Sequence, residues 1–221
     1  MHDWDLSPRE AIRLQSELAG RVILKDRFGA IDRVAGVDVG FEDSGRITRA
    51  AVVVMTWPDM EAVERAIARL PTSFPYVPGL LSFRELPAVL EAFARLKKKP
   101  DLAFCDGQGV AHPRRLGVAS HLGLLLDLPT IGVGKSRLVG SFEPPGEKKG
   151  DHSRLVDGEE QIGTVLRTRD GVRPLFVSPG HRVSQDTACE LVLAACPRYR
   201  LPEPIRAADR LASGRASAGP A

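Results

Sequence analysis

Short apolar runs recur along the chain, in one place replaced by an alternation of apolar and polar residues, and each of these stretches predicts a β-strand. The first two are Val34 to Phe41 and Ile47 to Trp57, the second with an unbroken apolar run from residue 50 to 55. Residues 60–70 fit a helix through their alanines and a strand through an alternation that begins at Val63, and we predict a strand. Further strands are expected at 102–105, 130–133, 159–168 and 172–177.

Capping signals and apolar residues at helical spacing predict the helices. Ser7-Pro8-Arg9-Glu10 forms a capping box with proline at the first helical position, and it opens a helix that reaches about Lys25. Ser82, with Glu85 three residues later, predicts a second capped helix from Phe83 to about Lys98. The remaining helices are expected at 115–126, 184–195 and 204–213, and loops at 72–81, 106–113 and 141–158.

The order of these elements predicts the fold class. Three early strands are followed by alternating helices and strands, which indicates an α/β fold with a mixed sheet flanked by helices. A length of 221 residues suits a single domain, which we place at residues 1–213. The small residues at 214–221 predict a disordered tail.

Composition and charge narrow the function only slightly. The sequence is 43% hydrophobic and 27% charged, as in ordinary globular proteins, and no run approaches the roughly 18–20 apolar residues of a membrane span. The three cysteines form no C-x-x-C pair, which is typical of a reducing compartment, so we expect a cytoplasmic protein. We further expect a monomer without a membrane partner. The net charge of +3 permits a nucleic-acid partner without requiring one.

Two aspartates stand in positions that favour chemistry. Asp38 lies inside the apolar strand Val-Ala-Gly-Val-Asp-Val-Gly, and Asp106 ends the strand Leu-Ala-Phe-Cys and starts a glycine-rich turn. Taken singly, a satisfied buried acid and a turn-forming residue explain them equally well. Two such acids on neighbouring strands would repel each other unless a cation lay between them, which favours a metal site.

Glu85 and Lys135 each have a local explanation beside a functional one. The capping box favours a structural role for Glu85, although a carboxylate at a helix N-terminus can also face a metal. Gly134-Lys135-Ser136 resembles the end of a phosphate-binding P-loop, but Pro129 stands where that loop needs its first glycine. A nucleotide site is therefore rejected, while Lys135 at a strand end remains a good phosphate contact.

A proline-braced loop and a basic segment complete the candidates. In Pro75-Tyr76-Val77-Pro78-Gly79 the tyrosine is either a buried loop anchor or a platform on which a base stacks. His112, Arg114 and Arg115 follow Asp106 closely and are suited to phosphates. The sequence contains neither G-x-S-x-G nor H-E-x-x-H, so serine-esterase and zinc-protease chemistry have little support.

Several of these stretches together resemble the endonuclease V family, in order and at matching spacing from about residue 8 to 213. The stretches are 37–41, 75–79, 82–85, 106–109, 112–121, 131–136, 180–184 and 199–204. The resemblance implies an RNase H-like fold and a DNA repair endonuclease that recognises deoxyinosine. It further implies a nick at the second phosphodiester bond 3′ of the deaminated base, which leaves a 3′-hydroxyl and a 5′-phosphate, with Mg²⁺ or Mn²⁺ as cofactor.

The same resemblance assigns roles to individual residues. Asp38, Glu85 and Asp106 match the catalytic and metal-binding carboxylates, and Asp209 matches a fourth metal position where some relatives carry histidine. Lys135 and His112 match catalytic residues that face the phosphate. The loop of Tyr76 matches a wedge that separates the DNA strands, and the lesion pocket is matched by Pro78, Gly79, Leu81, Gly107, Gly109 and Leu138. Gln108 departs from the family pattern, because relatives often have histidine or asparagine there.

Two alternatives stay open at this stage. A related RNase H-like nuclease, for example one that cuts RNA at inosine, would share the acids. A lesion-binding protein without activity would keep the wedge and the basic residues but would tolerate loss of the acids. The presence of Asp38, Glu85 and Asp106 together favours an enzyme.

Overall fold

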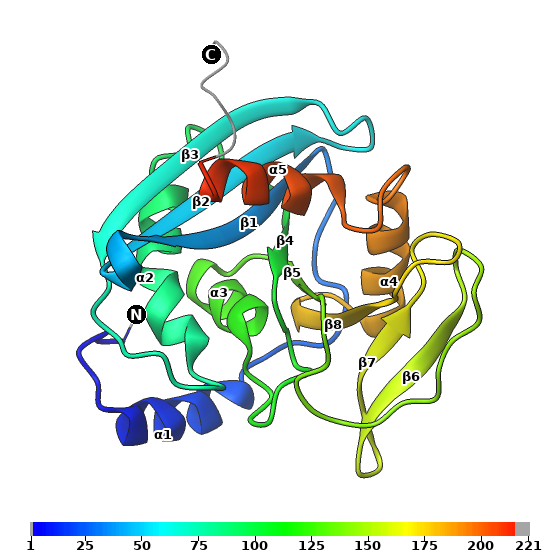
Figure 1. Ribbon diagram of the computed structural model, residues 1–221, viewed down its shortest axis with the longest axis horizontal. Helices are drawn as coiled ribbons and strands as arrows, with labels where there is room; N and C mark the ends of the chain where they lie inside the picture. The colour runs from blue at the N-terminus through cyan, green and yellow to red at the C-terminus, as the bar shows by residue number, and fades with distance from the viewer. Residues whose placement is uncertain (1, 215–221) are drawn as a thin grey trace.

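A computed structural model describes residues 2–214 as an eight-stranded sheet with helices packed around it (Figure 1). The strand order is β3-β2-β1-β4-β5-β8-β7-β6. The strands are β1 (Arg33–Glu42), β2 (Ile47–Thr56), β3 (Ala62–Pro71), β4 (Leu102–Asp106), β5 (Thr130–Gly134), β6 (His152–Asp157), β7 (Glu160–Leu166) and β8 (Leu175–His181). The helices are α1 (Pro8–Ala19), α2 (Leu81–Ala94), α3 (Val118–Leu126), α4 (Gln185–Ala194) and α5 (Glu203–Ala212), with a 3₁₀ turn at Asp43–Gly45.

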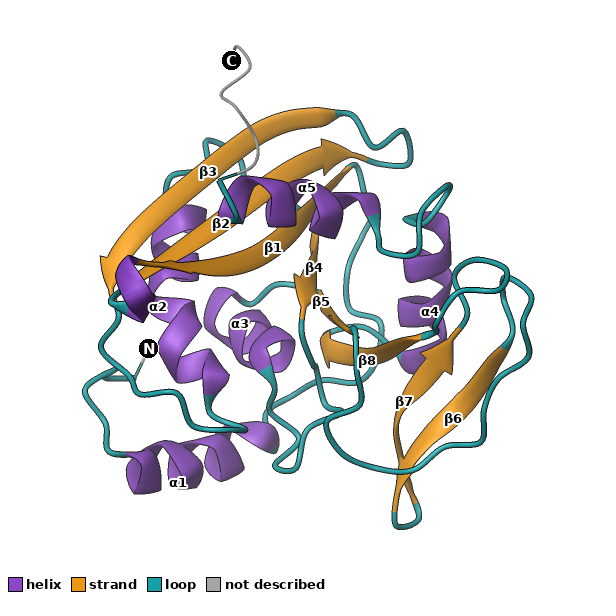
Figure 2. Ribbon diagram, viewed as in Figure 1, coloured by secondary structure: helices purple, strands orange, loops and turns teal. Residues whose placement is uncertain are grey.

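The sheet is mixed, and this confirms the predicted α/β, RNase H-like fold class (Figure 2). Strands β1, β4 and β5 run parallel, whereas β2 and β3 form an antiparallel meander beside β1. Strands β8, β7 and β6 extend the other edge with antiparallel pairs. The carboxyl ends of the parallel strands β1 and β4 therefore meet at one edge, where α/β folds place their ligands.

Helix α5 lies against one face of β1 and β2, and α2 covers the opposite face (Figure 1). Two glycines of β1 permit the close approach of α5. A Cβ atom at Gly36 would lie 1.9 Å from the carbonyl oxygen of Pro204, and one at Gly40 would lie 2.8 Å from that of Ala212. Because alternate residues of a strand share a face, Asp38 stands between these glycines on the side of α5.

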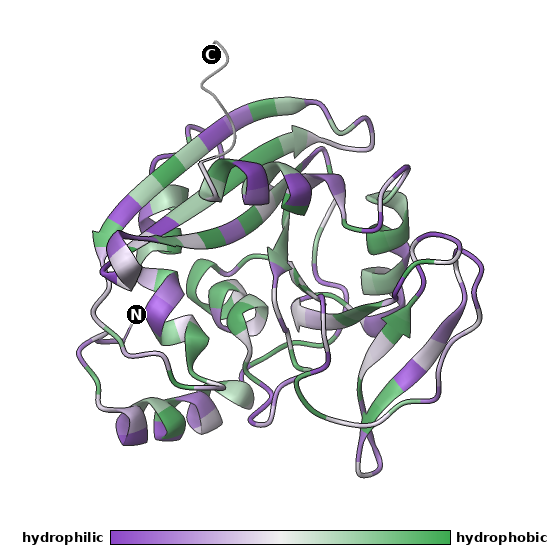
Figure 3. Cartoon of the chain, in the orientation of Figure 1, coloured by the Kyte–Doolittle hydropathy of each residue, from purple (hydrophilic) through white to green (hydrophobic). Residues whose placement is uncertain are grey.

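Apolar side chains fill the space on both faces of the sheet. Strands β1 and β2 and helix α3 are largely hydrophobic, while α1 and the β6–β7 hairpin show many polar positions (Figure 3). Cys105 of β4 is 1% exposed and packs with Ala35 and Val37 of β1. Burial, and then the charge of Asp106, raises the pKa of the Cys105 thiol well above its usual range. No helix within residues 2–214 is long and apolar enough to cross a membrane.

The predicted elements are present, with several changes of boundary. The ambiguous segment 60–70 is the strand β3, as predicted. Helix α1 begins with the predicted capping box but ends at Ala19 instead of near Lys25. The segment 141–158, expected to be a loop, contains the strand β6, whose backbone pairs with β7. The predicted tail at 214–221 lies, apart from Gly214, outside the described residues.

The predicted capping role of Ser82 and Glu85 is wrong. Helix α2 begins at Leu81, its N-cap is Leu80, and no side chain caps this helix. Ser82 lies inside the first turn, where its hydroxyl is 3.0 Å from Nδ1 of the buried His121. The Ser82 hydroxyl thus contacts a side chain that is distant in the sequence instead of capping the helix, and the carboxylate of Glu85 takes no part in a cap.

Candidate active site

Asp38 and Asp106 stand next to each other at the edge where β1 and β4 end. The two strands are parallel with Val37 opposite Cys105, so the following residue on each strand is one of these aspartates. Burial, and then the negative charge of Asp106, raises the pKa of Asp38 to about 7, even though the charge of Lys135 acts in the opposite direction. Two acids of neighbouring strands are thus held together in a partly desolvated place, as their sequence positions predicted.

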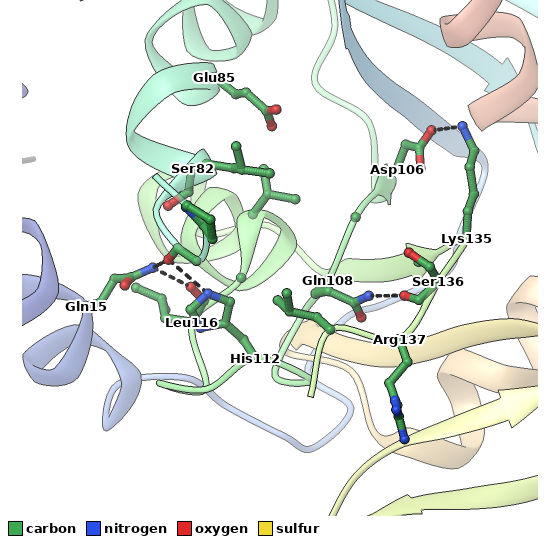
Figure 4. A pocket seen from close by; sticks show the side chains of 18 of the residues that line it. Gln15, Ser82, Glu85, Asp106, Gln108, His112, Leu116, Lys135, Ser136 and Arg137 are labelled. Carbon is green, nitrogen blue, oxygen red and sulfur yellow. Dashed lines mark hydrogen bonds and ion pairs between the residues drawn. The ribbon is translucent and has the colours of Figure 1, made fainter. Parts of the chain in front are cut away.

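Glu85 reaches the same place from helix α2. Burial, and then the charges of Asp38 and Asp106, together raise the pKa of its carboxyl to about 8. Figure 4 shows the Glu85 side chain at the same end of the pocket as Asp106, although the two come from different elements. The structure therefore brings together the three carboxylates that the sequence singled out.

Lys135 and Asp209 complete the charged cluster. Lys135 follows β5, and its ammonium group forms an ion pair with the Asp106 carboxylate (Figure 4). Burial lowers the pKa of Lys135, but the hydrogen bond and charge of Asp106 outweigh this and raise it overall. The charge of Asp209, on α5, raises the pKa of both Asp38 and Lys135, so α5 carries the fourth acid to the site.

The donors at this strand end are carboxylate oxygens, which are the ligands that a hard divalent cation such as Mg²⁺ prefers. Within the described part of the chain, no three His, Cys, Asp or Glu side chains are grouped closely enough to enclose a metal ion by themselves. Mg²⁺ keeps several waters and is bound through one or two carboxylates plus substrate phosphates, so it does not need a closed cage of side chains. The donors here are all oxygen atoms, and burial together with their mutual repulsion raises the pKa of Asp38 and Glu85. A divalent cation would relieve that repulsion.

A pocket of about 320 Å³ opens beside the acids (Figure 4). Its lining includes most of the predicted site residues, namely Tyr76, Pro78, Gly79, Leu81, Glu85, Asp106, Gly107, His112, Lys135 and Leu138. Gly109 is not among the lining residues. It is buried against β8, where a Cβ atom would lie 2.0 Å from the carbonyl oxygen of Pro179. The glycine serves close packing of the turn beneath the pocket.

Tyr76 is exposed, so the buried-anchor interpretation is wrong. Its side chain is 69% exposed, whereas Phe74 of the same loop is 3% exposed. Phe74 and Leu80 pack with Ala11 of α1 and with Phe83, which fixes the base of the loop. The aromatic ring of Tyr76 is left at the rim of the pocket, free to contact a ligand.

His112 faces this loop instead of solvent. It is 3% exposed, its Nδ1 accepts a hydrogen bond from the backbone N–H of Arg114 at 3.1 Å, and its Nε2 lies 3.0 Å from the carbonyl oxygen of Gly79. Since Nδ1 accepts, Nε2 carries the proton and donates. Burial, and then the charge of Arg114, lowers the pKa of His112 to about 4. The imidazole is therefore neutral, and neither ring nitrogen is available to a phosphate.

The two arginines after His112 are also engaged within the protein. Arg114 donates to Gly79 and to Gln15, and Arg115 forms ion pairs with Asp157 at 2.9 Å and Glu160 at 2.8 Å on the β6–β7 turn. Their suitability for phosphates, expected from the sequence, is thus not realised in this structure.

The lining also contains residues to which the sequence analysis gave no role in the pocket, among them Gln15, Ser82, Gln108, Leu116, Val118, Ser136 and Arg137. Arg137 is exposed and close to Lys135, so it adds a second cation at the rim. Its position two residues after Lys135 was the signal in the sequence. Gln108 donates from Nε2 to the carbonyl oxygen of Ser136 at 3.0 Å and lies against Gly134, which ties the turn after β4 to the end of β5.

Comparison with known proteins settles the family, since residues 16–210 match the family model described as Endonuclease V. The chain belongs to the endonuclease V family. It is 59% identical over 216 residues to Endonuclease V of Alkalilimnicola ehrlichii, an alignment that covers 97% of this chain and 95% of the relative. Membership makes the chain an endonuclease.

Solved structures of the family agree closely with this fold. The crystal structure of Endonuclease V from Streptomyces avermitilis has a TM-score of 0.91 at 48% identity and covers 96% of this chain and 94% of that one. Endonuclease V (D234N) of Ciona intestinalis, in complex with a 23mer DNA containing an inosine followed by a ribo-adenosine, has a TM-score of 0.84 at 29% identity. That alignment covers 95% of this chain and 98% of the Ciona chain.

Proposed function

We propose that this endonuclease V repairs DNA at deoxyinosine and other deaminated bases by hydrolysing the second phosphodiester bond 3′ of the lesion. The products are a 3′-hydroxyl and a 5′-phosphate. One observation carries the proposal: the acids of β1, β4 and α2 gather around a small hollow, and two of them, Glu85 and Asp106, also line the adjoining larger pocket that bears the exposed ring of Tyr76. The family relative from Ciona, which was solved with inosine-containing DNA, supports the substrate class.

Asp38, Glu85 and Asp106 are the residues that would hold Mg²⁺, or Mn²⁺ in its place, with Asp209 close by. When bound, the cation supplies Lewis-acid chemistry, lowering the pKa of a water and offsetting charge on the phosphate. The chain's own contribution is to keep these carboxylates together at the ends of β1 and β4, in spite of their repulsion.

Lys135 is the residue that would neutralise charge on the scissile phosphate. Its ammonium group already lies against Asp106, at the strand end that borders the pocket. Fixed positive charge aimed at the place where negative charge develops stabilises a transition state without reorganisation. Arg137 at the same rim would bind a neighbouring phosphate and so hold the strand.

The pocket is the place for the extruded base. An enzyme must take a base out of the stack to inspect it, and a mispaired base such as inosine costs less to extract. The volume of about 320 Å³ is at the small end of ligand pockets, which suits a single flat ring system. Leu81, Val118 and Leu138 offer apolar contacts to its faces.

Cleavage of end-labelled oligonucleotides tests the proposal. A duplex with one deoxyinosine should be cut once, one nucleotide beyond the lesion on its 3′ side, with Mg²⁺ and not with EDTA. The matched duplex with deoxyadenosine should remain intact. Cleavage of the inosine duplex in EDTA, or equal cleavage of both duplexes, would contradict the proposal. The same sequence should also be tested as RNA. If the RNA is cut faster than the DNA, the function is that of an inosine-directed ribonuclease and not of a DNA repair enzyme.

Tyr76 is expected to act as the wedge that fills the gap left by the extruded base. Stacking of a base on an aromatic ring is worth roughly 1–3 kcal/mol, so Tyr76→Ala should weaken binding of the inosine duplex by about 5- to 150-fold. Tyr76→Phe should restore most of the affinity, because the ring provides the stacking. Fluorescence anisotropy measures the binding. Since the side chain is 69% exposed, the melting temperature of both variants should stay near that of the wild type.

A further inference from the structure

Three hydrogen-bond donors converge on one carbonyl oxygen, that of Gly79 at the end of the Tyr76 loop. They are Gln15 Nε2 at 3.0 Å, His112 Nε2 at 3.0 Å and Arg114 Nη2 at 2.8 Å. A carbonyl oxygen has two lone pairs, so three donors saturate it. The donors come from α1 and from the segment before α3, both far from Gly79 in the sequence.

Gln15 is the residue that joins the two sides of this arrangement. Its side chain is 1% exposed, and besides Gly79 its Nε2 donates to the carbonyl oxygen of Leu116 at 3.0 Å. Its Oε1 accepts from Nε of Arg114 at 2.6 Å. Because arginine can only donate and the two carbonyls can only accept, the amide has one possible orientation. Gly79 and Leu116 both line the pocket, so Gln15 fixes two parts of its wall relative to each other.

The conformation of Gly79 makes this anchoring necessary. Its φ angle is +78°, in the left-handed region. Glycine adopts positive and negative φ angles about equally, so the residue itself does not favour this conformation over others. Phe74 and Leu80 hold the base of the loop through apolar contacts with α1, which are not directional. The carbonyl of Gly79 belongs to the Gly79–Leu80 peptide, whose N–H donates to the carbonyl oxygen of Val77 at 2.9 Å. The three donors on the Gly79 oxygen, together with this bond, define the direction of that peptide and with it the placement of the loop that carries Tyr76.

We propose that Gln15 is a positioning residue for lesion recognition: with Arg114 and His112 it holds Gly79 and the Tyr76 loop in the shape that receives the extruded base. The inference rests on the proposed function. Helix α1 is not part of the sheet and contacts the pocket wall through the buried amide of Gln15. The proposed role explains why a polar side chain is buried on this helix. Gln15 touches none of the acids described above, so it acts on recognition of the base and not on the chemical step.

Two substitutions at Gln15 separate its donors from its acceptor. Gln15→Met has similar length and makes no comparable hydrogen bond, whereas Gln15→Glu still accepts from Arg114 but cannot donate to Gly79 or Leu116. Both should weaken binding of the deoxyinosine duplex about 10-fold, which corresponds to about 1.4 kcal/mol. Binding of the matched undamaged duplex, which depends on phosphate contacts, should be unchanged. The KM for cleavage should rise to the same degree, while kcat should stay within about 3-fold of the wild type.

Val192→Ala provides the matched control, because Val192 is buried on α4 in the core on the other side of the molecule from the loop. It should lower the melting temperature and leave the preference for inosine unchanged. A wild-type preference in both Gln15 variants would overturn the inference, as would an equal loss of preference in Val192→Ala. A wild-type protein without any preference for the inosine duplex would instead contradict the proposed function itself.

Discussion

Replacing Asp106 or Asp38 by asparagine is expected to abolish cleavage of inosine DNA. A metal ion supplies several kcal/mol of charge stabilisation, so loss of a ligand should slow turnover on the order of 1,000-fold or more. Binding of the inosine duplex in EDTA should remain near that of the wild type, because removal of negative charge does not weaken phosphate contacts. Single-turnover cleavage with saturating enzyme measures the first effect, and anisotropy measures the second.

Asp59→Asn is the control for these two variants. Asp59 is an exposed acid between β2 and β3, away from the edge that carries Asp38 and Asp106, and its loss should leave cleavage unchanged. Full magnesium-dependent turnover by either Asp38→Asn or Asp106→Asn would show that the residue is not part of the metal site.

Glu85→Gln should reduce cleavage by orders of magnitude without destabilising the protein. Gln keeps the shape of Glu but cannot supply charge to a cation. Because no side chain caps α2, the change removes no helix cap. A variant that cuts normally would return Glu85 to a purely structural role.

The same variant also tests how the carboxyl of Glu85 affects stability at different pH values, when its melting temperature is compared with that of the wild type in metal-free buffer. Folding raises the pKa of Glu85 from its ordinary value of 4.5 to about 8, so between these two pH values the folded state binds more protons than the unfolded state. The free energy of unfolding of the wild type therefore falls as pH rises, at most by about 1.4 kcal/mol per pH unit from this residue. Glu85→Gln cannot lose that proton, and its melting temperature should exceed that of the wild type increasingly from pH 5 to pH 8. Equal melting curves across this range would mean that burial and the neighbouring acids do not raise the pKa of Glu85.

The sequence predicted those parts of the site that depend on strand patterns. Asp38 inside an apolar strand and Asp106 at the end of another were visible because hydrophobic periodicity defines strands, and parallel strands bring their ends together. Tyr76 was visible as an aromatic between prolines, although the sequence did not decide between exposure and burial. The structure decided it, because Phe74, two residues earlier, takes the buried position instead.

Other features could not be predicted because their partners lie far away in the sequence. Ser82 and Glu85 form a capping pattern over four residues, but His121, 39 residues further on, binds Ser82. Gln15 looked like any polar residue of a helix, since its partners Gly79 and Arg114 are 64 and 99 residues away. Strand β6 has few apolar side chains and is defined by its pairing with β7.

The position of Cys105 beside Asp106 has a consequence for the redox chemistry of the enzyme. Thiolates, not thiols, react with oxidants and alkylating reagents, and burial together with the neighbouring acid keeps this sulfur protonated. Its 1% exposure also denies access to peroxide or to a second thiol. The thiol in the strand that carries Asp106 is therefore unreactive. Oxidising conditions that damage reactive cysteines elsewhere would leave the geometry of this edge of the sheet intact.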